Sequence, residues 1–187
     1  MSDAQPAFHR REGALDSLAA WLQYLERAHP KSIAMGLDRV RRVQHALGFD
    51  PRFPIVTVGG TNGKGSVCMM LESILRAAGY RVACYTSPHL LAFNERVRVG
   101  GVPASDVGLI RVFERVERAR NDTPLTYFEF ATLAAMAIFI DANVDIAILE
   151  VGLGGRLDAV NAFDAECAVI TSIALDHMDY LGTSREA

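Results

Sequence analysis

The sequence predicts an α/β fold: a mostly parallel, doubly wound sheet with a phosphate-binding loop like that of the P-loop NTPases. First, short apolar and β-branched runs alternate with segments of helical periodicity. Second, the runs 144–151 and 167–175 are apolar almost throughout, which is typical of parallel strands covered on both faces. Third, a glycine-rich stretch at 59–66 separates one such run from a helical pattern. In this fold, ligands bind beyond the carboxyl ends of the strands.

Composition favours one compact domain in a reducing compartment. The 187 residues are 50% hydrophobic, and the formal charge of -3 predicts no broad basic face for nucleic acid. Cys68, Cys84 and Cys167 form neither a metal-binding pair nor an even disulfide framework, which favours the cytoplasm. The N-terminal residues lack the apolar core of a secretion signal, and the run 131–140 is too short to span a bilayer. We expect a soluble cytoplasmic protein without nucleic-acid or membrane partners.

Periodicity and capping residues predict the elements. Helical patterns cover 15–25 and 37–47, and Gly48 is placed as the C-cap of the second. After the glycine stretch, one apolar helical face carries Val67, Leu71, Ile74, Leu75 and Ala78, and Ser105 is expected to cap the next helix. A helix over 126–140 is apolar nearly all round and is predicted to be buried. The expected strands cover 53–58, 81–87, 144–151 and 167–175, with a hairpin over 95–103.

The glycine stretch resembles a phosphate loop with altered spacing. Three residues instead of the usual four separate Gly59 from Gly63, and Ser66 follows Lys64 by two positions instead of one. Because a helix begins here, backbone N–H groups and the positive end of the helix dipole can face an anion. Lys64 would add a positive charge on the outer phosphates, and Ser66 a hydroxyl for Mg²⁺. The alternative is a strand-to-helix turn that binds no ligand.

Chemically informative residues follow the other parallel strands, so four strand ends are expected to converge on one edge of the sheet. Glu150 ends an apolar strand, where a buried carboxylate needs hydrogen bonds or a metal such as Mg²⁺; otherwise it is simply solvated. His177 is either a second metal ligand or a residue that orients Asp176 or caps the next turn. Ser87 precedes a proline, which is also ordinary turn chemistry. The residues alone therefore indicate an ATP-type site with Mg²⁺ and leave the substrate open.

Two further acidic residues have structural alternatives. Thr126 and Glu129 match the S/T-x-x-E capping box, which is sufficient to explain Glu129. Arg156 and Asp158 lie in a loop with three glycines and form either an ion pair or contacts to a ligand.

Six motifs, in order along nearly the whole chain, resemble the folylpolyglutamate synthases and dihydrofolate synthases, relatives of the Mur ligases. They are GGTNGKGS, YTSPHL, ERVRV, LTYFEF, ILEVGLGGRLDA and SIALDHMDYLG. GTNGK alone indicates the wider Mur ligase group, whereas TSPHL and EVGLGGRLDA resemble the folate branch. The resemblance implies ATP-dependent amide formation between a folate-type carboxylate and the amine of L-glutamate, through an acyl phosphate. LTYFEF favours the bifunctional bacterial type, which ligates 7,8-dihydropteroate and extends the glutamate tail of tetrahydrofolate in folate biosynthesis and one-carbon metabolism.

The same resemblance implies site residues. The ATP phosphates would be held by Gly60, Thr61, Asn62, Gly63, Lys64, Gly65 and Ser66. Two Mg²⁺ ions are expected, on Ser66, Ser87, Glu150 and His177, and the catalytic residues would be Lys64, Glu150 and His177. The pterin substrate would lie against three segments: Ser32, Ile33 and Ala34; Thr126, Tyr127, Phe128 and Glu129; and Leu157, Asp158 and Ala159.

The chain also departs from the family pattern. Ala34 stands where the family has Asp, and Val160 where it has Thr. Ala187 comes just before the position of a family lysine, carbamylated, that helps to hold the second metal. We therefore expect residues 1–187 to be an incomplete N-terminal ATP-binding domain, inactive alone, of an enzyme that is monomeric at full length. The alternatives are a Mur-type ligase for a nucleotide-linked sugar and a nucleotide-binding module without catalysis.

Overall fold

The fold is a six-stranded sheet with helices on both faces, as the sequence predicts. The computed structural model describes residues 15–29 and 33–184. The strand order is β4-β3-β2-β5-β1-β6, in which β2, β5, β1 and β6 are parallel and β3 and β4 form an antiparallel hairpin. Their bounds are β1 Ile55–Gly59, β2 Val82–Tyr85, β3 Val97–Val99, β4 Val102–Pro103, β5 Ile146–Glu150 and β6 Cys167–Ile170.

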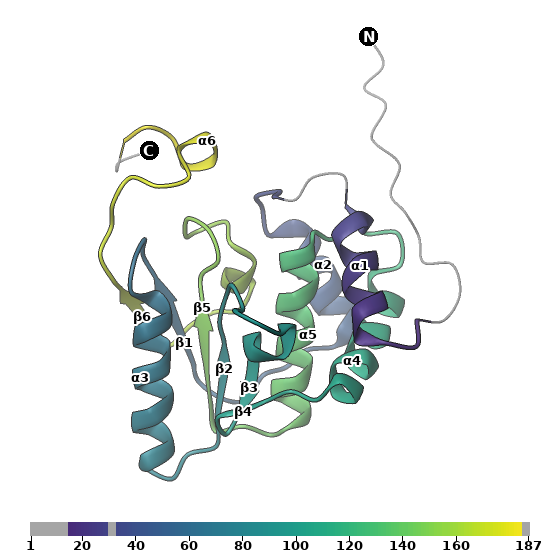
Figure 1. Ribbon diagram of the computed structural model, residues 1–187, viewed down its shortest axis with the longest axis horizontal. Helices are drawn as coiled ribbons and strands as arrows, with labels where there is room; N and C mark the ends of the chain where they lie inside the picture. The colour runs from purple at the N-terminus through teal and green to yellow at the C-terminus, as the bar shows by residue number, and fades with distance from the viewer. Residues whose placement is uncertain (1–14, 30–32, 185–187) are drawn as a thin grey trace.

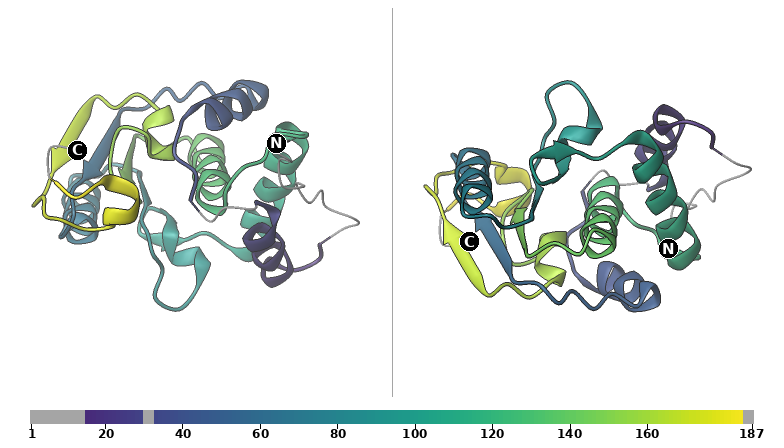
Figure 2. Two further views of the ribbon diagram at one scale, coloured as in Figure 1. Left: turned by 90° about the horizontal axis from the view of Figure 1, so that it is seen from above. Right: turned by 90° about the horizontal axis from the view of Figure 1, so that it is seen from below.

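The helices divide unequally between the two faces of the sheet. One face carries α3, and the other carries α5 with α1, α2 and α4 packed around it (Figures 1 and 2). The bounds are α1 Leu18–Ala28, α2 Asp38–Leu47, α3 Lys64–Ala77, α4 Asp106–Arg120, α5 Tyr127–Asp141 and α6 Met178–Leu181, with short 3₁₀ helices η1 Phe93–Arg96 and η2 Ala159–Ala162. This arrangement confirms the doubly wound prediction.

Each face of the sheet has its own hydrophobic cluster. On the α3 side, Cys68 packs with strand residues such as Val58 and Ile148. On the α5 side, a larger cluster includes Trp21, Phe113 and other residues of the outer helices. Because α5 lies between the sheet and those helices, its side chains are buried nearly all round, which confirms the expectation from its composition.

The predicted helix caps are confirmed. Gly48 ends α2 in a left-handed conformation with φ 65°, and Ser105 accepts a hydrogen bond from the N–H of Gly108 at the start of α4. The Thr126 hydroxyl and the Glu129 carboxylate complete the capping box of α5. These caps are short-range hydrogen bonds, which explains why the local sequence predicts them.

One expectation about burial was wrong, and the predicted apolar face of α3 is buried only in part. Strand β6 is mostly exposed, and Ile170 keeps 65% of its surface, because β6 lies at the edge of the described sheet. On the predicted face of α3, Val67, Leu71 and Leu75 pack against the sheet cluster, whereas Ile74 is 63% exposed and Ala78 is also exposed. Glu72 is buried as well. Glu72 is buried at this position because Arg98 Nε lies 3.1 Å from its Oε2 and balances the charge.

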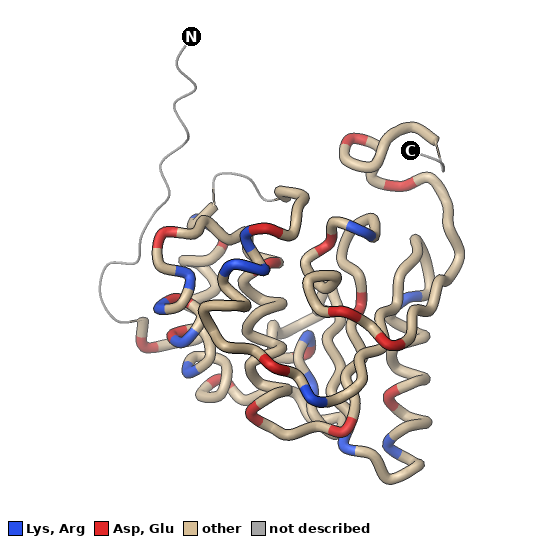
Figure 3. The backbone as a smooth tube through the Cα atoms, turned by 180° about the vertical axis from the view of Figure 1, so that it is seen from behind, with Lys and Arg blue, Asp and Glu red and all other residues tan. Residues whose placement is uncertain are grey.

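The described residues carry charges of both signs and include no membrane-spanning helix. Acidic and basic residues are interspersed along the described chain (Figure 3). Among the described helices, none has the length and apolar character needed to cross a bilayer.

Candidate functional site

The phosphate loop joins β1 to α3 in an open conformation that needs glycine. Gly60 and Gly63 have φ values of 132° and 85°, and Gly63 is the N-cap of α3 without any side-chain cap. The N–H groups of the first turn of α3 therefore lie at the loop. Lys64, the first helical residue, donates from Nζ to the carbonyls of Gly60 at 2.9 Å and Thr61 at 3.2 Å. The loop thus combines a helix N-terminus with an ammonium group, which suits phosphate.

The segment that follows β6 holds the tip of this loop. Thr61 N donates to Ser172 O at 2.8 Å, and the Thr61 hydroxyl exchanges hydrogen bonds with the backbone of Ala174. Thr171 packs against Gly60 so closely that a Cβ at Gly60 would overlap its hydroxyl oxygen. The role of Thr171 was missed from the sequence, since no local pattern marks a contact across more than a hundred residues.

Glu150 and Ser87 meet beside the start of α3. Glu150 ends β5 and is 4% exposed, and its Oε2 accepts a hydrogen bond from Ser87 N at 2.9 Å. A Cβ at Gly65 would lie 3.7 Å from Glu150 Oε1, so the carboxylate faces the first turn of α3, which also contains Ser66. Burial raises the pKa of Glu150, while the Ser87 N–H and the charges of Lys64 and Arg98 lower it. Glu150 thus lies beside Ser87 and beside the helical turn that contains Ser66, and oxygen-bearing residues of this kind suit Mg²⁺.

His177 lies in the exposed segment beyond β6. It precedes α6 with φ 48°, and its N–H donates to Asp176 Oδ1 at 2.8 Å. Half of its side chain is exposed, and α6 stands away from the sheet in Figure 1. Within residues 15–29 and 33–184, no three His, Cys, Asp or Glu side chains gather closely enough to hold a metal. The contact with Asp176 matches the alternative assignment of His177, and its role as a metal ligand stays a prediction.

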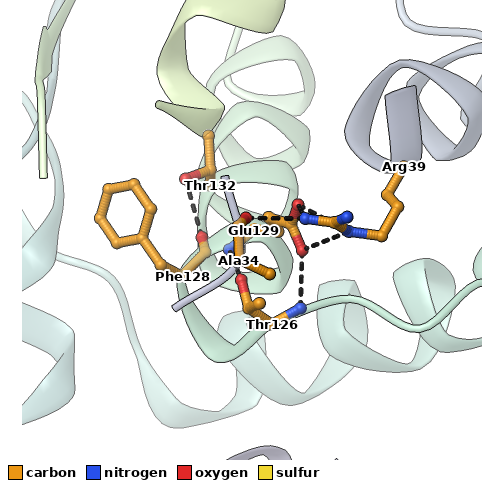
Figure 4. Close-up of polar contacts among 6 residues, drawn as sticks. All are labelled: Ala34, Arg39, Thr126, Phe128, Glu129 and Thr132. Carbon is orange, nitrogen blue, oxygen red and sulfur yellow. Dashed lines mark hydrogen bonds and ion pairs between the residues drawn. The ribbon is translucent and has the colours of Figure 1, made fainter. Parts of the chain in front are cut away.

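Two of the three predicted substrate segments are joined by an arginine that the sequence did not single out. Ser32 lies outside the described residues, and Ile33 and Ala34 precede α2. Arg39 donates to the carbonyl of Ala34 and to the carboxylate of Glu129, at the start of α5 (Figure 4). Glu129 is thus both a helix cap and an ion-pair partner, which goes beyond the capping role that its motif predicts.

The third predicted segment is organised by Asp158. Its buried carboxylate accepts backbone hydrogen bonds from Gly152, Leu153 and Val160, at 3.0, 2.9 and 3.1 Å. Burial raises the pKa of Asp158 to about 6, and the three N–H donors and Lys64 oppose that shift. The carboxylate shapes the loop and caps η2, where Ala159 is buried, and no ion pair with Arg156 is found among the described residues.

All three segments lie close together at the carboxyl end of the sheet. Gly36 N donates to Leu157 O at 3.4 Å, which brings the loop before α2 to the third segment. The ring of Phe128 packs against Tyr85 at 5.8 Å between centroids, and a Cβ at Gly152 would be 2.6 Å from it. Tyr127, by contrast, faces Arg96, whose guanidinium carbon is 5.5 Å from its ring centroid. Glu150, which faces the first turn of α3, lies two residues before Gly152, so the phosphate loop adjoins the same region.

A phosphate loop at a helix N-terminus, a buried acid at the end of the neighbouring strand and an adjoining aromatic segment are features of α/β domains that bind nucleotide phosphates. The family model of the Mur ligase middle domain matches residues 58–187. The chain therefore belongs to the Mur ligase middle-domain family.

Within that family, the chain is similar to bifunctional folate enzymes, which confirms the resemblance found from the motifs. The dihydrofolate synthase/folylpolyglutamate synthase of Escherichia coli K12 is 54% identical over 179 residues, 95% of this chain and 42% of that protein. The structure of E. coli FolC in complex with DHPP and ADP superposes with a TM-score of 0.90 at 54% identity, covering 91% of this chain and 42% of that chain.

A folylpolyglutamate synthase/dihydrofolate synthase with Mn, AMPPNP and L-glutamate bound has a TM-score of 0.85 at 53% identity, covering 91% of this chain and 42% of that chain. The chain thus spans about two fifths of the length of the relatives that it matches.

Proposed function

We propose that this chain is the N-terminal part of an ATP-dependent ligase that joins L-glutamate to 7,8-dihydropteroate and extends the glutamate tail of tetrahydrofolate. The observation that carries the proposal is the convergence of the phosphate loop, Glu150 and the three substrate segments at one edge of the sheet. The relatives with ADP, with AMPPNP and Mn, and with L-glutamate bound support the same reaction. The remainder of the ATP-binding domain and a C-terminal ligase domain would then belong to the full-length enzyme.

The reaction would proceed through an acyl phosphate. The carboxylate of dihydropteroate attacks the γ-phosphorus of ATP, and the bond from that phosphorus to the bridging oxygen of ADP breaks. The amine of glutamate then attacks the acyl carbon, loses a proton, and expels phosphate as the amide forms. Lys64 and the N–H groups at the start of α3 would orient the phosphates and stabilise the charge that develops on them.

The oxygen ligands at the loop suit a divalent cation. Ser66, Ser87 and Glu150 would hold Mg²⁺, with His177 as a further ligand. Bound Mg²⁺ would neutralise charge on the transferred phosphoryl group. The acceptor site would be formed by the three substrate segments described above, with Phe128 as its aromatic surface.

We also propose a cytoplasmic enzyme that is a monomer at full length and binds no nucleic acid. The free thiols of Cys68, Cys84 and Cys167 support a reducing compartment. The interspersed charges seen in Figure 3 support the absence of a nucleic-acid face.

The test is an ADP-release assay on the full-length enzyme with ATP, Mg²⁺ and L-glutamate, comparing dihydropteroate with tetrahydrofolate as acceptor. We expect turnover that requires both glutamate and an acceptor, and a product lengthened by one glutamyl group in mass spectrometry. ATP binding without acceptor-dependent ADP release would instead indicate a nucleotide-binding module, and turnover only with a nucleotide-linked sugar would indicate a Mur-type ligase. Residues 1–187 alone are expected to be inactive, so glutamate-dependent turnover by them would contradict the proposed incompleteness.

A further inference from the structure

Arg39 fastens two segments of the acceptor site to each other. From the first turn of α2, its Nη2 donates to Ala34 O at 2.7 Å and to Glu129 Oε1 at 2.8 Å. Its Nε lies 3.1 and 3.3 Å from the two carboxylate oxygens of Glu129. Figure 4 shows the planar guanidinium between the loop before α2 and the first turn of α5. One side chain therefore sets the distance between two segments that are 90 positions apart or more in the sequence.

The hydrogen bonds of Arg39 to Ala34 and Glu129, here called the Arg39 clamp, are held in a single geometry. Glu129 has a side chain that is 4% exposed, and its Oε2 also accepts from Thr126 N at 2.7 Å. Both carboxylate oxygens are thus occupied, and neither can turn without breaking the cap of α5. Arg39 is 27% exposed, so its ion pair is partly shielded from water. A planar, fork-shaped donor can satisfy the carboxylate and the carbonyl together, which an ammonium group cannot do in the same geometry.

The clamp bears directly on the surface that faces the acceptor. Phe128 precedes Glu129, and the Thr132 hydroxyl holds the Phe128 carbonyl at 2.8 Å, so the turn moves as one unit with the cap. On the other side, Gly36 connects the loop before α2 to Leu157. A shift of the loop relative to the start of α5 would therefore change the width of the site in which an aromatic acid must lie.

We propose that Arg39 is a positioning residue for dihydropteroate, the acyl donor that accepts glutamate, and that it acts by holding the Ala34 loop at a set distance from Phe128 through Glu129. This inference rests on the proposed function. Arg39 need not touch the acceptor, ATP or glutamate. Because the hydrogen bonds of Arg39 run to Ala34 and Glu129 and not to the phosphate loop, the use of ATP should be insensitive to this network.

The experiment compares Arg39→Met, Arg39→Lys and wild type in the full-length ligase, with the KM for dihydropteroate and for ATP measured separately. Losing a charged hydrogen-bond network of this kind should raise the KM for dihydropteroate on the order of ten-fold in Arg39→Met. The KM for ATP should change by less than about two-fold, since ATP binding uses none of these contacts. Arg39→Lys keeps the charge without the fork and should fall between the two.

The matched control is Arg115→Met. Arg115 Nη1 pairs with Asp141 Oδ1 at 2.9 Å, so this variant removes an arginine–carboxylate pair from the opposite end of α5. It should lower the melting temperature and leave the KM for dihydropteroate unchanged. A second check is Glu129→Gln, because if Arg39 acts through Glu129, then Arg39→Met combined with Glu129→Gln should raise that KM little more than Arg39→Met does.

Three outcomes overturn the inference. One is a folded Arg39→Met enzyme with an unchanged KM for dihydropteroate, and another is an equal rise in both KM values, which indicates general destabilisation. If Arg39→Met does not fold, Arg39→Lys decides by the same split between acceptor and ATP. A wild-type enzyme that ligates neither dihydropteroate nor tetrahydrofolate overturns the proposed function, and this inference with it.

Discussion

Replacing Gly60 with Ala tests how the phosphate loop is held. Gly60 has φ 132°, a conformation that side chains rarely adopt, and holding alanine there costs about 1–3 kcal/mol. The new Cβ would also overlap the Thr171 hydroxyl and lie 3.1 Å from both Thr171 Cβ and Thr171 N. Overpacking of this kind costs about 1–3 kcal/mol more. We expect Gly60→Ala to lower the free energy of unfolding by roughly 4 kcal/mol.

Gly63→Ala is the matched control within the same loop. Gly63 has φ 85°, but nothing lies within 4 Å of the position that an alanine Cβ would take there, so only the backbone cost of about 1–2 kcal/mol applies. Urea unfolding measures both variants, and calorimetry measures their affinity for ADP. In a Thr171→Ala background, Gly60→Ala should cost about 1 kcal/mol less than in wild type, because the overlapping hydroxyl is gone.

Two results would refute this reasoning. If Gly60→Ala and Gly63→Ala destabilise equally, the contact with Thr171 contributes nothing. If Thr171→Ala leaves the cost of Gly60→Ala unchanged, the loop moves away from the segment beyond β6 without resistance.

Three further predictions concern charged groups of the site. Lys64→Ala in the full-length enzyme should weaken ATP binding at least about ten-fold, because a charge-assisted contact to the phosphates is lost. The circular dichroism spectrum should be unchanged. Wild-type turnover in this variant would contradict the phosphate-loop assignment. Glu150→Gln should abolish the extra thermal stabilisation that Mg²⁺ adds to that of ADP. It should not lower the stability of the ligand-free protein, because burial raises the pKa of this carboxyl and so disfavours its charged form. Retained stabilisation by Mg²⁺ would argue against a metal role for Glu150. Burial raises the pKa of Asp158 from 3.8 to about 6, so the protonated side chain stabilises the fold by roughly 3 kcal/mol below pH 4, and this contribution is lost as pH rises through 6. Urea unfolding at several pH values should show this loss in wild type but not in Asp158→Asn. Parallel curves of unfolding free energy against pH for the two proteins would contradict it.

Elements with local signals were predicted well. Gly48, Ser105 and the Thr126–Glu129 capping box all act within a few residues, so their roles can be read from neighbouring letters. The buried helix α5 follows from its apolar composition in the same way. By contrast, the expected burial of β6 was wrong, because the coverage of a strand depends on which elements pack against it.

In the candidate site, too, the features with local sequence signals were predicted and the long-range contacts were not. The order of motifs predicted that the ends of β1, β2 and β5 meet, and the parallel pairing places Val58 beside Glu150, with Ser87 on the Glu150 carboxylate. The metal role of His177 and the substrate roles of the three segments stay predictions. Arg39 was missed because its partner is 90 positions away and its own surroundings carry no distinctive pattern.

The sequence by itself determined the alternation of strands and helices, the glycine loop with Lys64, and the acids at the strand ends, because periodicity, backbone preference and motif spacing are properties of neighbouring residues. Only the tertiary structure decided which distant groups meet. It placed Thr171 against Gly60, Arg39 between Ala34 and Glu129, and three backbone N–H groups around the Asp158 carboxylate. These contacts depend on packing across the sheet and between helices, where burial makes each unpaired polar group costly and so selects one arrangement.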